Sequence, residues 1–387
     1  MDDPTLTLDP EKLRTTVKGD ALGDNLQELL VNMGPQHPST HGVLRLLLHM
    51  EGEVVTDAVV HIGYLHRAME KLCERRNYFQ VIPLTDRNDY LCAMTNNQVY
   101  CQAVEKLMGL EVPDRAHFIR VIVMELNRIA SHLIWLGTFA LDLGAMSVFL
   151  YCFREREKIL SFFEEICGAR LTYSYMRIGG VPWDLPEGWG DRVRAFVEGF
   201  PGYLEENDQL LTGNEIFLSR TRGIGLLEPE VAVDYGCSGP TLRGSGVAYD
   251  VRKAEPYAVY DRLDFDVPVQ HTQDCLGRYL VRVAEMRESC RLVRQSLDLL
   301  PAGDVMAKTP KTLRPAASEV YTRVESPRGV LGVYLVSDGT TSPYRLKWRA
   351  PSFSNLQAIP HMCRGWKIAD VVAILGSIDV VLGDVDR

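Results

Sequence analysis

Residues 133–153 read LIWLGTFALDLGAMSVFLYCF, and the interpretation of this stretch decides the fold. Its length is that of a membrane-spanning helix, which needs about 20 apolar residues. However, Asp142 lies near its middle, Gly137 and Gly144 interrupt it, and a lone carboxylate at the centre of a bilayer is costly. We therefore expect a buried pair of core helices in a protein that is soluble by itself and reaches a membrane only through partners.

The flanking sequence extends this helical interpretation in both directions. Pro113-Asp114 is expected to open a helix over residues 115–136, and a second helix is expected over residues 147–167, ended by Gly168. Further helices are expected over residues 63–77 (with Leu65, Met69 and Leu72 on one face), 89–108, 191–211 (interrupted at Pro201), 277–300 (with exposed arginines) and 366–375.

Strands are expected at both ends of the chain. Val43–Met50 and Glu53–Ile62 flank a glycine turn, which indicates a β-hairpin, and residues 319–349 alternate in the manner of a β-meander. The fold class is therefore α+β: a helical core over residues 63–300, preceded by a polar arm over 1–30 and a β-rich segment over 31–62. A β-rich segment and tail over 301–387 follow it.

Composition excludes some classes of function. The net charge of -9 and the pI near 5.6 argue against a nucleic-acid partner, which requires a basic surface. Nine cysteines follow a polar N-terminus that does not resemble a signal peptide, so reduced thiols are expected. No two of these cysteines form a C-x-x-C pair.

The densest group of unusual residues is GPQHPSTHG, residues 34–42. His37 and His41 have the i, i+4 spacing of a zinc-binding helix, but Pro38 and Gly42 favour a loop, and no glutamate follows the first histidine. On these residues alone, a turn whose histidines only hydrogen-bond to the backbone remains the alternative.

The wider pattern resembles a known family. The stretch GPQHPSTHGVLRL is similar to the opening signature of the D subunit of respiratory NADH-quinone oxidoreductase (complex I), which shares the large-subunit fold of nickel–iron hydrogenases. Further similar motifs are HIGYLHRAMEK (61–71), DRNDY (86–90), ELNRIASH (125–132), FREREK (153–158), RIGGV (177–181), RTRGIG (220–225), LRGSG (242–246), YLVSDG (334–339) and GDVDR (383–387).

The resemblance implies a quinone site. In the family, a loop histidine and the tyrosine of the D-Y motif hold the quinone headgroup, which maps to His41 and Tyr90, with His37 as a further candidate. A carboxylate that orients the histidine maps to Asp142. An adjacent aspartate raises the pKa of an imidazole, so His41 could donate a proton. The alternatives are a core tyrosine at Tyr90 and a buried acid bonded to backbone donors at Asp142.

The resemblance also implies a face that receives electrons. Arg67, Arg87 and Arg177 are candidates for the face toward a partner's iron–sulfur cluster, although each alone is also consistent with a surface or ion-paired arginine. Many relatives have a histidine at the position of Thr172, where it couples the cluster potential to pH. We therefore hypothesise a lower, less pH-dependent cluster potential, suited to a low-potential quinone such as menaquinone.

Missing motifs limit the chemistry that this chain can perform alone. The C-x-x-C pairs that hold nickel and iron in hydrogenases are absent, and Ser377-Ile378-Asp379-Val380-Val381 stands at the equivalent of the second pair. No glycine pattern fits a dinucleotide, and no cysteine spacing fits a cluster. We thus expect no metal or cofactor on this chain alone. The segment 304–318 is shorter than in many relatives.

The family implies a place in a larger assembly. Expected partners are the small iron–sulfur subunit (the B subunit), the C and I subunits, and the membrane-embedded H subunit, at the cytoplasmic side of the inner membrane. Two alternatives are the large subunit of a membrane-bound hydrogenase-related complex and a non-catalytic scaffold of such a complex. Which quinone is used, and whether NADH or another carrier donates the electrons, depends on other subunits.

Overall fold

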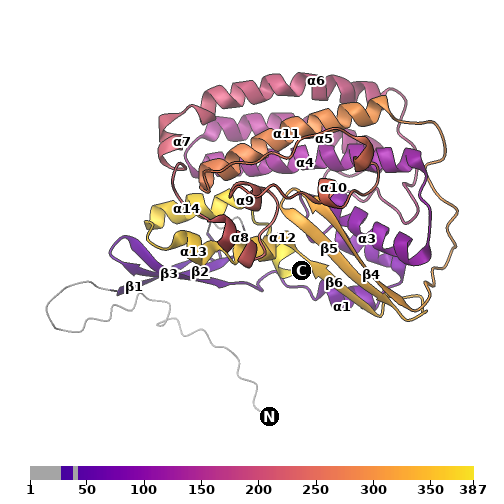
Figure 1. The fold of residues 1–387 in the computed structure, drawn as a ribbon, viewed down its shortest axis with the longest axis horizontal. Helices are drawn as coiled ribbons and strands as arrows, with labels where there is room; N and C mark the ends of the chain where they lie inside the picture. Colours follow the sequence, from indigo (N-terminus) through magenta and orange to yellow (C-terminus); the bar gives the residue numbers. More distant parts are fainter. Residues whose placement is uncertain (1–27, 38–41) are drawn as a thin grey trace, which may run out of the picture.

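The computed structural model describes residues 28–37 and 42–387. It has a layer of long helices above two small antiparallel sheets, with the C-terminus between the sheets (Figure 1). The long helices are α4 (Asp114–Asp142), α5 (Met146–Cys167), α6 (Trp189–Asn207) and α11 (Cys275–Asp298). This arrangement confirms the α+β fold class.

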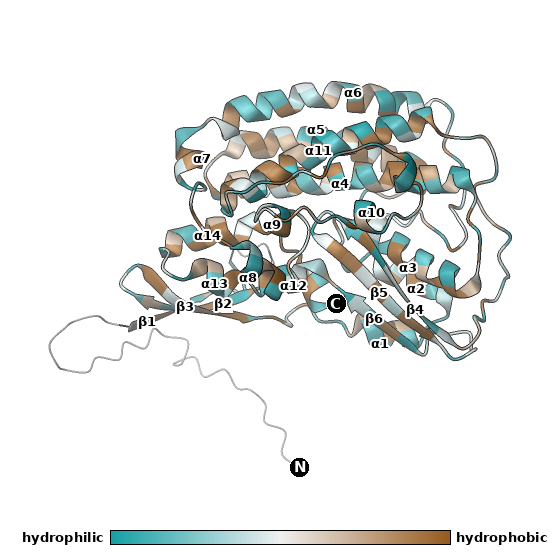
Figure 2. Cartoon of the chain, viewed as in Figure 1, coloured by the Kyte–Doolittle hydropathy of each residue, from teal (hydrophilic) through white to brown (hydrophobic). Residues whose placement is uncertain are grey.

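The helix pair expected from residues 133–153 is present as the end of α4 and the start of α5. The two helices touch at Gly137, where a β-carbon would lie 3.4 Å from the Cys152 side chain. The interpretation as buried core holds for α4 but not for the first turns of α5, where Met146 and Leu150 are 54% and 56% exposed. Polar residues recur along α4, α5 and α6 (Figure 2), and no described helix is long and apolar enough to cross a membrane.

The N-terminal sheet has the order β1-β2-β3, with β1 at Glu28–Met33, β2 at Arg45–Glu51 and β3 at Val54–His61. The expected hairpin is β2 and β3, which turn at Gly52, where φ is +61°. Strand β1 was not expected. It pairs antiparallel with β2, so the hairpin becomes a three-stranded sheet.

The C-terminal sheet confirms the expected meander. Its strands are β4 (Ser318–Ser326), β5 (Gly329–Ser337) and β6 (Arg345–Arg349), in sequential antiparallel order. Helix α3 (Ala93–Met108) packs on β4 and β5.

Short helices and turns connect these layers. They are α1 (Met69–Glu74), α2 (Tyr78–Thr85), α7 (Glu215–Ser219), α8 (Pro229–Asp234), α9 (Pro240–Arg243), α10 (Val251–Ala254), α12 (Pro351–Leu356), α13 (Ile359–Cys363), α14 (Ile368–Ser377), α15 (Leu382–Asp386), the π-helical turn η2 (Asp208–Thr212) and the 3-10 turn η3 (Tyr260–Arg262).

Three helix predictions were wrong in part. The helix expected over 63–77 contains only α1, with α2 beginning just after its end, and Leu65 and Leu72 are exposed. The backbone N–H groups of Gly63 and Leu65 donate to the Asp386 carboxylate instead of to a helical carbonyl. Helix α6 continues through Pro201, which is exposed, so the ring is accommodated on the outer face of the helix.

The third error concerns the arginines of α11. Their regular spacing predicts a solvent-exposed stripe, yet Arg278 and Arg282 are fully buried, whereas Arg294 further along the helix is exposed. The buried face of α11 packs against α4, α9 and α14. The guanidinium groups bond to backbone carbonyls there, including those of Gly225 and Ser377.

Candidate functional site

A pocket of about 310 Å³ lies at the end of α4, between the loop before α3 and the turn after α14. It is lined by Tyr90, Leu91, Ile134, Trp135, Thr138, Leu141, Asp142, Asp379, Val380 and Val381. Tyr90 and Asp142, two of the residues expected in a quinone site, therefore border the same space. A larger groove of about 790 Å³ between α5 and α6 contains none of the expected site residues.

Close packing of α14 on α4 sets the position of the pocket. The Trp135 indole donates to the carbonyl of Gly376 at 2.7 Å. A β-carbon on Gly376 would lie 2.8 Å from the Phe139 ring, so glycine is required for this approach. The chain then turns at Asp379, where φ is +55°, and leads Val380 into the pocket wall. The end of α4 brings Asp142, partly exposed, to the same wall.

Tyr90 is held by the loop between α2 and α3. The backbone carbonyl of Asp89 accepts from the side chain of Asn96 at 3.0 Å and from the N–H of Cys92, which fixes the turn around Tyr90. Burial raises the pKa of Tyr90, and the charge of Asp89 raises it further. The phenol therefore remains protonated at neutral pH and can donate a hydrogen bond into the pocket.

A buried arginine, Arg328, lies behind the pocket and bonds to side chains beside it. Arg328, in the turn between β4 and β5, donates to Asp89 Oδ2 at 3.1 Å, to Asp379 Oδ1 at 3.2 Å, and to the hydroxyl of Ser131. Burial raises the pKa of Asp89; Arg328 lowers it, and the nearby carboxylates of Asp384 and Asp379 raise it. One guanidinium thus binds two buried carboxylates, of which Asp379 lines the pocket and Asp89 precedes Tyr90.

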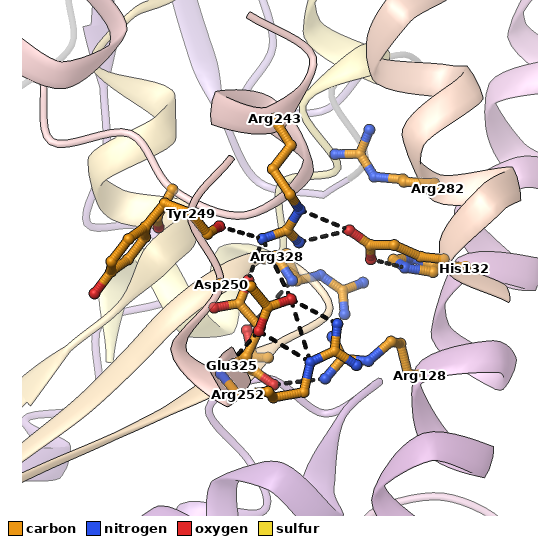
Figure 3. A network of polar contacts seen from close by, with 12 residues as sticks. Arg128, His132, Arg243, Tyr249, Asp250, Arg252, Arg282, Glu325 and Arg328 are labelled. Carbon is orange, nitrogen blue, oxygen red and sulfur yellow. Dashed lines mark hydrogen bonds and ion pairs between the residues drawn. The ribbon is translucent and has the colours of Figure 1, made fainter. Parts of the chain in front are cut away.

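A larger buried network of ion pairs lies in the interior (Figure 3). Glu285 accepts from His132 at 2.9 Å and from Arg243 at 2.5 Å, and Arg243 also binds Glu325 at 2.8 Å. Burial lowers the pKa of His132, so the imidazole is neutral at physiological pH. The network ends in Asp250, Arg252, Glu125 and Arg128.

Sequence reasoning missed Arg328, Asp89 and Asp379 as neighbours of the pocket. The sequence places Arg328 only in a turn, and Asp379 only at the position of a lost cysteine motif. No spacing rule connects them, since they come from three separate segments of the chain. The sequence did contain one signal, the charge of Asp379. This lone aspartate lies in the apolar run from Val371 to Val381, where burial without a partner is costly.

The expected cluster-facing residues lie outside the pocket lining. Arg67 donates to the backbone carbonyl of Arg87 at 2.9 Å, and Arg87 lies 3.5 Å from the Asp86 carboxylate. Arg177 donates to the carbonyl of Met176 at 2.8 Å, and burial raises the pKa of Asp86 while the charge of Arg177 offsets part of that rise. Thr172 adopts a left-handed conformation, with φ at +51°.

The histidine loop is described only at its ends. His37 is exposed and forms an isolated β-bridge with Gly42. His41 lies outside the described residues, so its expected contact with Asp142 stays a prediction. Within residues 28–37 and 42–387, no group of three His, Cys, Asp or Glu side chains is placed to hold a metal ion. All nine cysteines are free thiols.

Comparison with known proteins identifies the family. The family model described as "Respiratory-chain NADH dehydrogenase, 49 Kd subunit" matches residues 142–317 and 310–387. The chain is therefore of the class of respiratory-chain NADH dehydrogenase subunits. A protein of Geobacillus thermodenitrificans that bears the name of the NADH-quinone oxidoreductase D subunit is 55% identical over 361 residues, which is 93% of this chain and 99% of the relative.

Other relatives bear the same name. Proteins of Desulforamulus reducens and Koribacter versatilis, both named as D subunits of NADH-quinone oxidoreductase, are 54% and 52% identical, over 93% of this chain and 98% and 96% of their own lengths. The chain belongs to the family of NADH-quinone oxidoreductase D subunits, as its motifs indicated.

Proposed function

We propose that this chain supplies the quinone pocket of a proton-translocating NADH-quinone oxidoreductase. The observation that carries the proposal is that Tyr90 and Asp142, which lie on different elements, border one pocket. A phenol can donate a hydrogen bond and a proton to a quinone carbonyl, and a carboxylate can orient a second donor. The apolar remainder of the lining, including Trp135 and Val380, suits the ring.

Reduction of a quinone to a quinol takes two electrons and two protons. Tyr90 is protonated at neutral pH and donates to one carbonyl oxygen of the headgroup. His41, oriented by Asp142, donates to the other. The electrons come from the iron–sulfur cluster of the small partner subunit, toward which Arg67, Arg87 and Arg177 face. This chain contributes binding and protons, and it carries none of the redox groups.

The same proposal covers partners and location. The chain contacts the small iron–sulfur subunit, the C and I subunits and the membrane-embedded H subunit, and it sits peripherally on the cytoplasmic side of the inner membrane. The exposed side chains of Met146 and Leu150 lie just beyond Asp142 in the sequence, and Leu141 borders the pocket and is 39% exposed. Exposed apolar groups beside a pocket support an apolar partner or a lipid-borne substrate there.

Tyr90→Phe in the assembled complex tests the proposal. Removal of one proton donor is expected to lower quinone reduction by about 10²- to 10⁴-fold. Reduction of an artificial acceptor that takes electrons before the quinone step is expected to stay unchanged. Tyr344→Phe is the matched control, because Tyr344 is 66% exposed in the loop before β6.

Two results would contradict the proposal. Undiminished quinone reduction by the Tyr90→Phe complex would indicate a scaffold. Nickel bound to the purified complex in stoichiometric amount would indicate a hydrogenase-related enzyme.

A further inference from the structure

Arg282 has hydrogen-bonding groups that its surroundings do not use. It is fully buried on α11, and its Nη1 donates to the carbonyls of Arg278 at 3.1 Å and Ser377 at 2.8 Å. Its Nε and Nη2 have no hydrogen-bond partner among the described residues. The guanidinium lies over the Trp135 ring, 4.4 Å from the centroid, so it stands directly behind a wall of the pocket. Figure 3 shows it beside His132.

Asp379 has a matching unused acceptor. Its Oδ1 accepts from Arg328, whereas its Oδ2 has no hydrogen-bond partner in the described part of the chain. The side chain is 7% exposed and borders the pocket. Arg282 Nε and Asp379 Oδ2 are 4.0 Å apart, which is too long for a direct hydrogen bond.

One unused donor, Arg282 Nε, therefore lies 4.0 Å from one unused acceptor, Asp379 Oδ2, beside the pocket. Buried polar groups are rarely left unbonded, because the loss of their solvation is unfavourable. Arg282 Nε and Asp379 Oδ2, 4.0 Å apart, are at a separation that one water molecule can bridge. It can bond to each group at about 2.9 Å with an angle of about 90° between the two bonds. An anion would be repelled by Asp379 and a cation by Arg282, whereas water both accepts and donates.

We propose that Arg282 and Asp379 bind one internal water molecule at the pocket wall, and that Arg282 positions the Asp379 carboxylate through it. This inference rests on the proposed function only for its effect on turnover. The water bonds to Oδ2 of Asp379 and Arg328 bonds to Oδ1. The carboxylate group is therefore held in one orientation and does not turn an oxygen toward the bound headgroup. The reduced headgroup gains negative charge before it is protonated, so a freely rotating carboxylate at this wall would disfavour reduction.

Several charged or titratable groups face Asp379, and each contributes to a pH profile. They are Arg282 on α11, Arg328 in the β4–β5 turn, Asp89 and Tyr90 in the loop before α3, His132 on α4, Asp142 at the end of α4, and Asp384 on α15. Arg328 bonds to Asp379 directly and not through a solvent molecule, so only Arg282 depends on the water.

The decisive experiment is a map of the assembled wild-type complex at a resolution that shows ordered water. We expect density within hydrogen-bonding distance of both Arg282 and Asp379, and its loss in Arg282→Met. Absence of density in the wild type would overturn the proposal, as would its persistence in Arg282→Met. The wild-type map needs no variant, so it decides the question even if Arg282→Met fails to assemble.

Kinetics of the assembled variants test the positioning role. Arg282→Met is expected to lower kcat for quinone reduction by about tenfold, as for a lost buried hydrogen bond, with little change in KM and a shifted pH profile. Arg282→Lys, whose ammonium can still donate to the water, should recover part of kcat. Arg294→Met, on the exposed part of α11, is the matched control and should behave as wild type. Equal kcat in Arg282→Met and wild type would overturn the role.

The two proposals fail in different ways. If Tyr90→Phe lowers turnover but Arg282→Met does not, the quinone pocket stands and the positioning role of Arg282 is wrong. If the water is present but Tyr90→Phe is fully active, the water site stands and the proposed function is wrong.

Discussion

Replacing Asp86 with asparagine should stabilise the folded chain, and more so at neutral than at acidic pH. Asp86 is 1% exposed, and its Oδ1 has no hydrogen-bond partner among the described residues. Burial raises its pKa from 3.8 to about 6, although the charges of Arg87 and Arg177 lower it. Asparagine has nearly the same shape and carries no charge, so the substitution removes the unfavourable burial of the carboxylate.

The size of the effect follows from the shift in pKa. The Asp86 carboxyl has a higher pKa in the folded chain than in the unfolded chain, so the folded chain binds its proton more tightly. The free energy of unfolding therefore falls as the pH rises from the unfolded pKa to the folded pKa. A shift of about two units corresponds to about 3 kcal/mol at about pH 7.5, and to about 1 kcal/mol at about pH 4.5, where the folded carboxyl is mostly protonated. Asp86→Asn should therefore raise the free energy of unfolding by at most these amounts at the two pH values.

The assay is denaturant unfolding of the purified chain at both pH values, with wild type and variant compared at each. Asp234→Asn is the control, because Asp234 is exposed at the end of α8. It should change the free energy of unfolding by at most about 0.5 kcal/mol at either pH. A gain from Asp86→Asn that is absent, or equal at both pH values, would refute the reasoning.

Two further predictions concern the pocket and the cluster-facing side. Gly383→Ala would place a β-carbon 2.3 Å from the carbonyl oxygen of Asn88 and 3.4 Å from the Tyr90 ring; we expect about 1–3 kcal/mol of destabilisation and slower quinone reduction. Gly199→Ala on α6 meets no atom within 4 Å and should instead be neutral or stabilising, so equal losses in both variants would contradict the packing argument. Thr172→His should make the reduction potential of the partner's iron–sulfur cluster depend more steeply on pH. The substitution should be tolerated, because histidine adopts positive φ more readily than a β-branched residue. Redox titration of the assembled complex across pH measures this slope, and an unchanged slope would count against the hypothesis.

Local patterns predicted most of the fold. The apolar spacing of α4 and α5 and the alternation of the C-terminal meander are properties of short segments. Helix α5 and the meander lie within a few residues of their expected bounds, whereas α4 continues past residue 136 to Asp142. Strand β1 was not predicted, since its pairing with β2 depends on a contact between segments. The burial of Arg278 and Arg282 also could not be predicted, because a stripe of arginines looks the same whether it faces water or buried carbonyls.

The candidate site, like the fold, could be predicted from the sequence only in part. Tyr90 was singled out because it lies in a recognisable motif and Asp142 because it interrupts an apolar run, and both border one pocket. The surrounding ion pairs of Arg328 with Asp89 and Asp379 join residues far apart in sequence, and no periodicity or spacing encodes such pairs. Physical reasoning from sequence could identify the costly charges but not their partners.

The turn at Asp379 has a consequence for biosynthesis. Translation reaches residues 379–381 only after the long helices and both sheets have been made, yet these residues form one wall of the pocket. A nascent chain whose residues 379–381 are still held in the ribosomal exit tunnel has no complete binding site. A chain truncated before residue 379 would therefore lack one wall of the pocket even if its long helices and both sheets were folded.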